Sequence, residues 1–82
     1  MAEKTLDATG LSCPLPVLKA RKALREMAPG QTLELLATDP GAVEDIPAFC
    51  LTSGHELLES STINNNMYRF IIKNGGERIY SK

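Results

Sequence analysis

Residues 4–38, KTLDATGLSCPLPVLKARKALREMAPGQTLELLAT, decide the fold, because the spacing of their apolar residues changes twice. Residues 4–8 alternate between apolar and polar, which predicts a short strand. Residues 14–28 have the spacing of an amphipathic helix of about four turns. Its expected buried stripe is Val17, Ala20, Leu24 and Met27, with Leu18 alongside. Pro29-Gly30 ends that helix, and residues 31–38 return to strand alternation.

The next segment, residues 40–53, is again helical by its spacing. Its apolar positions are Val43, Ile46, Phe49 and Cys50. Asp39 before Pro40 is a cap signal, and Gly54 stands where a helix often ends. Pro47 would remove a hydrogen bond from a helix interior at a cost of roughly 3 kcal/mol. We therefore expect either a kink or a loose turn over residues 40–45, with the regular helix running from about Asp45 to Ser53.

Two strands close the chain, residues 55–63 and 67–73, joined by a turn at the three asparagines 64–66. Tyr68, Phe70 and Ile72 alternate with Met67, Arg69, Ile71 and Lys73 and are expected to face the core. Residues 75–82 are weakly patterned and are expected to be disordered. The order βαβαββ predicts an α/β (α+β) fold, a two-layer sandwich in which two helices pack on one face of a mixed four-stranded sheet.

The composition is that of one folded domain, residues 1–82 with a core of about 4–74: 43% of residues are hydrophobic and 23% charged. A net charge of −1 and a pI near 5.7 give no bulk attraction to nucleic acid or to anionic membranes. No apolar run reaches the roughly 18 residues of a membrane span, and the N-terminus lacks the pattern of a signal peptide. We therefore expect a cytoplasmic protein whose two cysteines are thiols.

The stretch GLSCPLP, residues 10–16, places a cysteine between a glycine and two prolines at the start of the first helix. If Pro14 is the first helical residue, Cys13 is the N-cap, and the helix dipole lowers the pKa of its thiol. Pro16 then stands at the third position and leaves only the amide of Leu15 to bond the sulfur. Such a thiol is activated but weakly held, which suits transfer. A lone cysteine can also be a small buried apolar residue.

At these residues the chain resembles the TusA/SirA family of small sulfur-carrier proteins. The family's hallmark is a CPxP motif at the start of the first helix, after a D-x-x-G-L segment. The matching residues are Asp7, Gly10, Leu11, Cys13, Pro14 and Pro16. The likeness continues through KARKAL, PGQTLELLATDP, DIPAFC and GHELLES to YRFIIK, so it covers about residues 5–74.

The resemblance implies that Cys13 accepts sulfane sulfur as a persulfide from a cysteine desulfurase or a rhodanese-like protein. The sulfur then passes to a cysteine of an acceptor protein, in tRNA thiolation, molybdenum cofactor maturation or sulfur oxidation. It implies a persulfide carrier rather than a stand-alone multiple-turnover enzyme, with no metal and no organic cofactor. Leu15 stands where TusA proteins dedicated to tRNA thiolation often carry an acidic residue. A hydrophobic Leu15 beside the thiol could belong to a surface that docks a partner.

The remaining polar residues are expected to be structural. Cys50 lies on an apolar helix stripe and is expected to be buried and inert. His55 is expected to be a surface or capping residue, and Asp7 to stabilise a turn. One histidine and two separated cysteines offer too few ligands for a metal site.

The first helix carries four basic residues close to Cys13, and these are Lys19, Arg21, Lys22 and Arg25. Such a run is often simply solvated, but it could also guide an acidic partner protein to the thiol. Direct nucleic-acid binding is not expected, because no aromatic residues are interleaved with these charges to stack bases. We expect a monomer that docks transiently.

Two other functions are compatible with the residues alone. Cys13 and Cys50 could form a thiol-disulfide redox pair, although their spacing is not that of a redox motif. Alternatively, the chain could be a non-catalytic adaptor or regulatory module that binds a partner through the first helix, with Cys13 only capping that helix.

Overall fold

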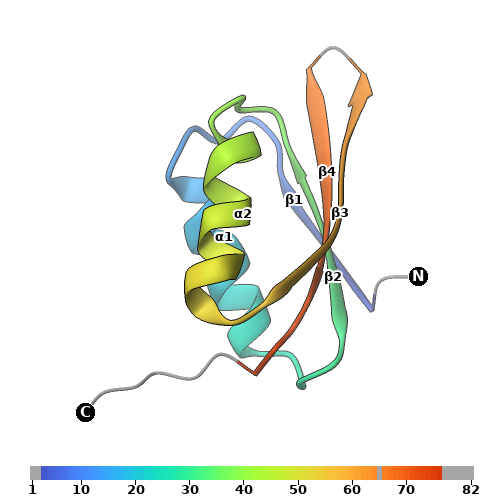
Figure 1. Ribbon diagram of the computed structural model, residues 1–82. Helices are drawn as coiled ribbons and strands as arrows, with labels where there is room; N and C mark the ends of the chain where they lie inside the picture. Colours follow the sequence, from blue (N-terminus) through green and yellow to red (C-terminus); the bar gives the residue numbers. More distant parts are fainter. Residues whose placement is uncertain (1–2, 65, 77–82) are drawn as a thin grey trace.

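The computed structural model describes residues 3–64 and 66–76. Its elements are β1 (Lys4–Ala8), α1 (Leu15–Arg25), β2 (Thr32–Ala37), α2 (Ala42–Ser53), β3 (Glu56–Asn64) and β4 (Met67–Lys73). The sheet order is β1-β2-β4-β3, with β1 parallel to β2 and the other two pairs antiparallel. Both helices lie on the same face of this sheet (Figure 1). The predicted two-layer α/β (α+β) sandwich with a mixed four-stranded sheet is confirmed.

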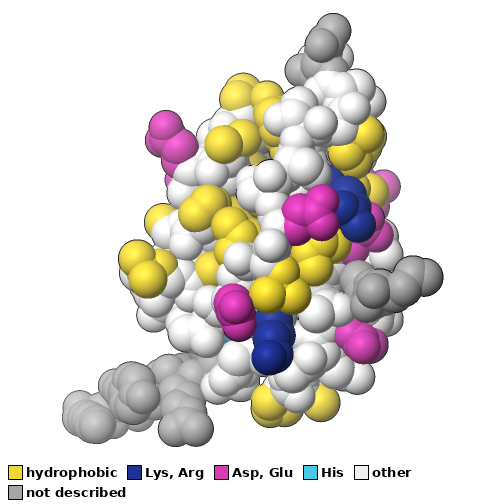
Figure 2. Space-filling view, turned by 45° about the vertical axis from the view of Figure 1, so that its right-hand side comes forward, with side chains coloured by type: hydrophobic (Ala, Val, Ile, Leu, Met, Phe, Trp, Pro, Cys, Tyr) yellow, Lys and Arg dark blue, Asp and Glu magenta, His cyan; other side chains and the backbone are white. Residues whose placement is uncertain are grey.

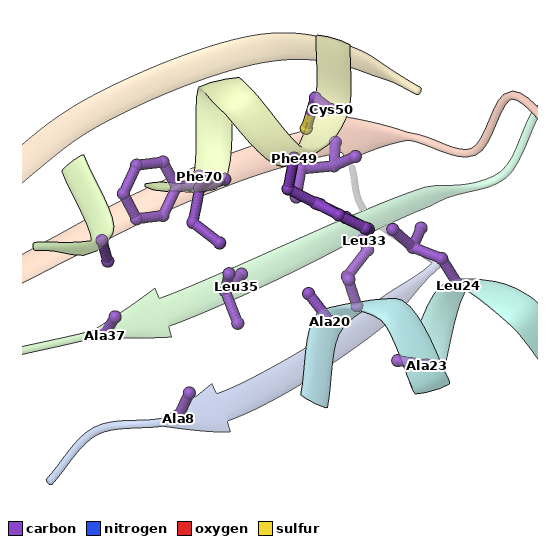
Figure 3. Close-up of a cluster of buried hydrophobic side chains, with 13 residues drawn as sticks. Ala8, Ala20, Ala23, Leu24, Leu33, Leu35, Ala37, Phe49, Cys50 and Phe70 are labelled. Atoms are coloured by element: carbon purple, nitrogen blue, oxygen red, sulfur yellow. The ribbon is translucent and has the colours of Figure 1, made fainter. Parts of the chain in front are cut away.

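The core lies between the two central strands and the helices (Figure 3). Leu33 pairs with Ile72 and Leu35 with Phe70 across β2 and β4, and all four side chains are fully buried. Burying a side chain of this size stabilises the fold by roughly 1.5 to 3 kcal/mol. The prediction that Phe70 and Ile72 face the core is confirmed, while Tyr68 is partly buried against it.

The other face of the sheet is covered by neither helix, and Figure 2 shows apolar, basic and acidic side chains interspersed on the side of the molecule that the sheet forms. Arg69 connects three strands there. Its Nε lies 2.5 Å from Glu34 Oε2 on β2, and a terminal nitrogen lies 3.1 Å from Glu59 Oε2 on β3. These cross-strand ion pairs are part-exposed, so each contributes on the order of 1 kcal/mol or less.

Helix α1 starts later than the sequence predicts, at Leu15 rather than Pro14. Pro14 is the N-cap, with φ −99° and ψ 19°, and helical hydrogen bonding begins with the Leu18 amide and the Pro14 carbonyl at 3.1 Å. The prediction that Cys13 is the N-cap is therefore wrong: Cys13 precedes the cap. The expected donation from the Leu15 amide to the sulfur is also wrong, because that amide bonds the carbonyl of Ser12 at 2.9 Å.

The C-terminal end of α1 lies at Arg25, short of the predicted residue 28, and a distant side chain completes it. Asn74 follows β4, is 2% exposed, and directs its Nδ2 at the end of the helix. Nδ2 donates to the carbonyls of Leu24 at 2.9 Å, Met27 at 2.9 Å and Ala28 at 3.2 Å. The carbonyls at a helix end need such partners because no further turn supplies amides to them.

Helix α2 is regular from Ala42, so the expected loose turn over residues 40–45 is wrong. Its N-cap is Gly41, and Pro47 lies inside the helix. Pro47 leaves the carbonyl of Val43 without its helical donor. Val43 is itself 42% exposed, contrary to its predicted place on the apolar stripe, so solvent can reach this part of the helix. Gly54 ends α2 with φ +82°, as predicted.

His55 is buried, so the surface position that the sequence allowed for it is wrong, while its amide bonds the carbonyl of Cys50 at the end of α2 at 2.9 Å. Its ring centroid lies 5.4 Å from that of Phe49, and its Nδ1 accepts the amide of Gly75 at 3.1 Å. Strand β3 starts at Glu56, one residue after the predicted position. The prediction of a disordered tail falls mostly on residues 77–82, outside the described part of the chain, whereas Gly75 is held by this histidine.

Candidate functional site

Cys13 is exposed in the loop between β1 and α1, where that loop meets the beginning of α2. Both helices begin at the same end of the molecule (Figure 1). The Cys13 amide donates to Asp39 Oδ2 at 2.7 Å, and the Cys13 thiol donates to Asp45 Oδ2. Two carboxylates from the loop before α2 and from its first turn therefore bind the residue that precedes α1.

These carboxylates reverse the predicted electrostatics of the thiol. The hydrogen bond to Asp45 is the largest cause that raises the pKa of Cys13; desolvation and the negative charges of Asp45 and Asp39 add to it. The prediction of a lowered pKa is wrong, because it rests on the dipole and the basic residues of α1 and includes no group from α2. The structure instead places Cys13 one residue outside the cap of α1 and beside acidic groups of α2. The hydrogen bond and the two carboxylates therefore favour the protonated form of the Cys13 thiol.

Hydrogen bonds of Asp7 and of Gly10 fix the start of the loop that carries Cys13. Asp7 Oδ1 accepts the amide of Thr9 at 2.9 Å and its hydroxyl at 2.6 Å, so Asp7 stabilises the turn after β1 as predicted. These bonds lower the pKa of Asp7. Gly10 has φ +81°, a conformation that side chains disfavour, and its amide bonds Thr38 Oγ1 at 2.8 Å. The loop is thus tied to the end of β2.

The two prolines of the motif differ in their surroundings. Pro16 is fully buried and packs at the second position of α1, not the third as predicted. Pro14 is exposed, and so is Leu15, whose side chain is 45% accessible. The motif therefore anchors one proline in the core and leaves an apolar side chain beside the exposed thiol.

The four basic residues of α1 do not all line the same hollow. Lys19 and Lys22 lie together on the exposed side, where both line the same hollows. The Arg21 guanidinium lies 5.4 Å from the ring centroid of Phe49 on α2, and Arg25 occupies the last turn of α1. Of these four residues, Lys19 and Lys22 line the same hollow as Leu15.

Cys50 is 2% exposed in the core side of α2, and burial raises the pKa of its thiol to about 11. The predicted burial is confirmed. Within the described residues both cysteines are free. Cys50 lies five residues beyond Asp45, about 8 Å farther along the helix axis than the residue that bonds Cys13. The structure therefore does not support a pairing of the two cysteines.

Across residues 3–64 and 66–76, no group of three or more histidine, cysteine, aspartate or glutamate side chains is placed to hold a metal ion. In the same part of the chain, no helix is both long and apolar enough to cross a membrane.

Asp39 and Asp45 are site residues that the sequence alone does not reveal. Local patterns mark Asp39 only as a cap signal and Asp45 only as the start of a helix. One signal in the sequence could have indicated them. Acidic residues stand at the start of the second helix, and the predicted fold places the start of that helix near the start of the first. Asp39 and Asp45 are 26 and 32 residues away from Cys13 in the sequence, and local patterns do not reveal contacts over such separations.

A sequence profile of the family described as sulfurtransferase TusA matches residues 4–74. The chain belongs to the TusA family. It is 48% identical over 71 residues to a protein of Allochromatium vinosum named sulfur carrier protein TusA, a match that spans 87% of this chain and 92% of the relative. The fold is similar to the crystal structure of a SirA-like protein from Desulfitobacterium hafniense, with a TM-score of 0.78 at 27% identity. That similarity covers 88% of this chain and 97% of the other.

Proposed function

We propose that this protein is a sulfur carrier that holds sulfane sulfur as a persulfide on Cys13. The observation that carries the proposal is an exposed cysteine on a fixed loop, hydrogen-bonded through its thiol to a carboxylate, in a chain of the TusA family. An exposed thiol with a nearby proton acceptor has what nucleophilic attack on sulfur requires. Cys50 does not meet this requirement, because it is buried and its pKa is raised.

Loading exchanges one sulfur–sulfur bond for another. Cys13 Sγ attacks the outer sulfur of a donor protein's persulfide, the new Sγ–S bond forms, and the donor's S–S bond breaks with its electron pair on the donor's cysteine. The thiol proton of Cys13 passes to Asp45 and from there to the departing thiolate. The products are the Cys13 persulfide and the donor thiol, so no external oxidant or reductant takes part.

Unloading is the same exchange with a new partner. A thiolate of the acceptor protein attacks the outer sulfur of the Cys13 persulfide, and Cys13 Sγ leaves with the electron pair. The proton that the acceptor thiol gives up as it becomes a thiolate passes through Asp45 to Sγ. The partners are a cysteine desulfurase or rhodanese-like donor and an acceptor protein with a reactive cysteine, in tRNA thiolation, molybdenum cofactor maturation or sulfur oxidation. A monomer in the cytoplasm, where thiols stay reduced, suits this role.

The experiment is intact-protein mass spectrometry after incubation with a cysteine desulfurase and L-cysteine. The wild-type protein and Cys50→Ala should gain the mass of one sulfur atom, released by dithiothreitol, and Cys13→Ala should gain none. A mass gain that persists in Cys13→Ala and is lost in Cys50→Ala would overturn the proposal. Full in vivo activity of Cys13→Ser would favour a non-catalytic adaptor.

A further inference from the structure

An apolar hollow of about 400 Å³ lies on the exposed side of α1, and its lining includes residues two positions before and two positions after Cys13 in the chain. We call it the α1 groove, and its lining residues are Leu11, Leu15, Leu18, Lys19 and Lys22. The four helical members follow the spacing that places side chains on one face of a helix. Leu15 is 45% and Leu18 52% exposed, whereas the opposite face of α1 is buried in the core.

A second hollow, of about 220 Å³, continues the α1 groove towards the end of the helix. Lys19 and Lys22 line both hollows, and Lys4 of β1 adds a third positive charge. Glu26 is the single acidic residue of the lining. The surface is therefore apolar near Cys13 and positive farther along α1. Lys22 lies about 10 Å beyond Leu15 along the helix axis.

The other side of Cys13 has the opposite charge. Asp39 and Asp45 bond Cys13 from that side, and Glu44 is exposed in the same turn of α2. Carboxylates of a partner are repelled by this side and attracted by the lysines of the α1 groove. A partner with acidic residues around its cysteine thus has one favourable approach.

We propose that the α1 groove docks the sulfur-donor protein through a segment with apolar side chains beside its reactive cysteine and carboxylates about two helical turns away. The inference rests on the proposed function, because sulfur transfer requires contact between the two sulfur atoms. The donor's surface must then cover the residues around Cys13, and Leu15 is two positions away. Apolar contact supplies affinity, and the lysines orient the donor and speed its encounter.

The test compares two sulfur donors, a purified cysteine desulfurase with L-cysteine and the small molecule cysteine persulfide. The readout is the ratio of the loading rates of Cys13 from the two donors, measured at low protein concentration. Leu18→Asp and the double variant Lys19→Glu/Lys22→Glu should lower this ratio about tenfold, chiefly through KM for the desulfurase. Added salt should raise that KM for the wild type and have little effect in the double variant.

Matched controls carry the same substitutions outside the α1 groove. Leu51→Asp on α2, where Leu51 is 83% exposed, and Lys73→Glu at the end of β4 should leave the ratio unchanged. An unchanged ratio in the groove variants, or an equal fall in the controls, would overturn the docking proposal. A wild-type dimer that Leu18→Asp converts to a monomer would assign the groove to a second copy and overturn it too. Failure of both donors to load the wild type would instead refute the sulfur-carrier function.

Discussion

The Cys13 thiol donates its hydrogen bond to Asp45, so a carboxylate in the first turn of α2 holds the proton of a cysteine that precedes α1. Asp45 is half-buried and Cys13 is exposed. The pair keeps the unloaded cysteine as a thiol and places a proton acceptor beside it. The same hydrogen bond between Cys13 and Asp45 thus keeps the sulfur protonated at rest and provides the group that can accept its proton when it reacts.

Replacing Asp45 by asparagine should lower the pKa of Cys13. The substitution removes a negative charge and the largest cause that raises this pKa, while a side chain of the same shape remains. The measurement is the rate of iodoacetamide alkylation of Cys13 as a function of pH, in a Cys50→Ala background. The midpoint of the profile should move to lower pH, and alkylation at neutral pH should be faster than in the parent.

Glu44→Gln is the matched control for that experiment, because Glu44 is the adjacent acidic residue and is not among the groups that shift the pKa of Cys13. Its alkylation profile should coincide with that of the parent. An Asp45→Asn profile that stays in place or moves to higher pH would show that the carboxylate does not hold the thiol proton in solution.

Asp39 fixes the backbone of Cys13, and its loss should affect both stability and sulfur loading. Asp39→Ala leaves the Cys13 amide without its 2.7 Å acceptor and should lower the free energy of unfolding by about 0.5 to 1.5 kcal/mol. Loading from a cysteine desulfurase should slow, because the loop no longer presents Sγ in one position. Asp39→Asn retains a side-chain oxygen and should recover most of both losses. Equal defects in the two variants would assign the effect to charge rather than to the hydrogen bond.

The fold could be predicted because its signals are local. Alternation of Leu33, Leu35 and Ala37 marks a strand with one buried face, and the apolar positions of α1 mark a helix with one buried stripe. Connection rules then reduce the possible arrangements of six elements to few. The helix boundaries were less accurate, since Pro14 and Pro47 have positional preferences that packing can override.

The electrostatics of the site could not be predicted because they arise from contacts between distant segments. The motif around Cys13 locates the thiol, but the groups that set its pKa come from Asp39 and Asp45. Likewise, nothing near Leu24 indicates that Asn74, 50 residues later, completes α1. Contacts of this kind depend on how one helix or strand is positioned against another. No periodic pattern in a single sequence indicates that positioning.

Asn74→Ala should destabilise the protein by about 1 to 3 kcal/mol, because the carbonyls of Leu24, Met27 and Ala28 lose a buried donor. Urea denaturation followed by circular dichroism measures the change. Asn74→Asp keeps the oxygen that accepts the Gly76 amide but has no donor, so it should be at least as damaging. Lys73→Ala, an exposed neighbour, should change stability by less than about 0.5 kcal/mol. If Asn74→Asp were as stable as the wild type, the hydrogen bonds from Asn74 Nδ2 to the end of α1 would contribute nothing to stability.

The buried thiol of Cys50 should make the protein lose stability at alkaline pH. Burial raises the pKa of this group from 9.0 to about 11, so folding favours its protonated form. The resulting stability is fully present below the unfolded-state pKa and is lost as the pH rises through the folded-state pKa. Full ionisation would lower the free energy of unfolding by roughly 2 to 3 kcal/mol.

Urea denaturation at intervals from pH 7 to about pH 11 should therefore show a steeper fall in the free energy of unfolding for the wild type than for Cys50→Ala, which lacks the titrating group. Cys13→Ala should retain the part of the fall that Cys50 causes and lose only what the raised pKa of Cys13 adds. Parallel curves for the wild type and Cys50→Ala would show that Cys50 titrates as an exposed thiol does, and would contradict its place in the core.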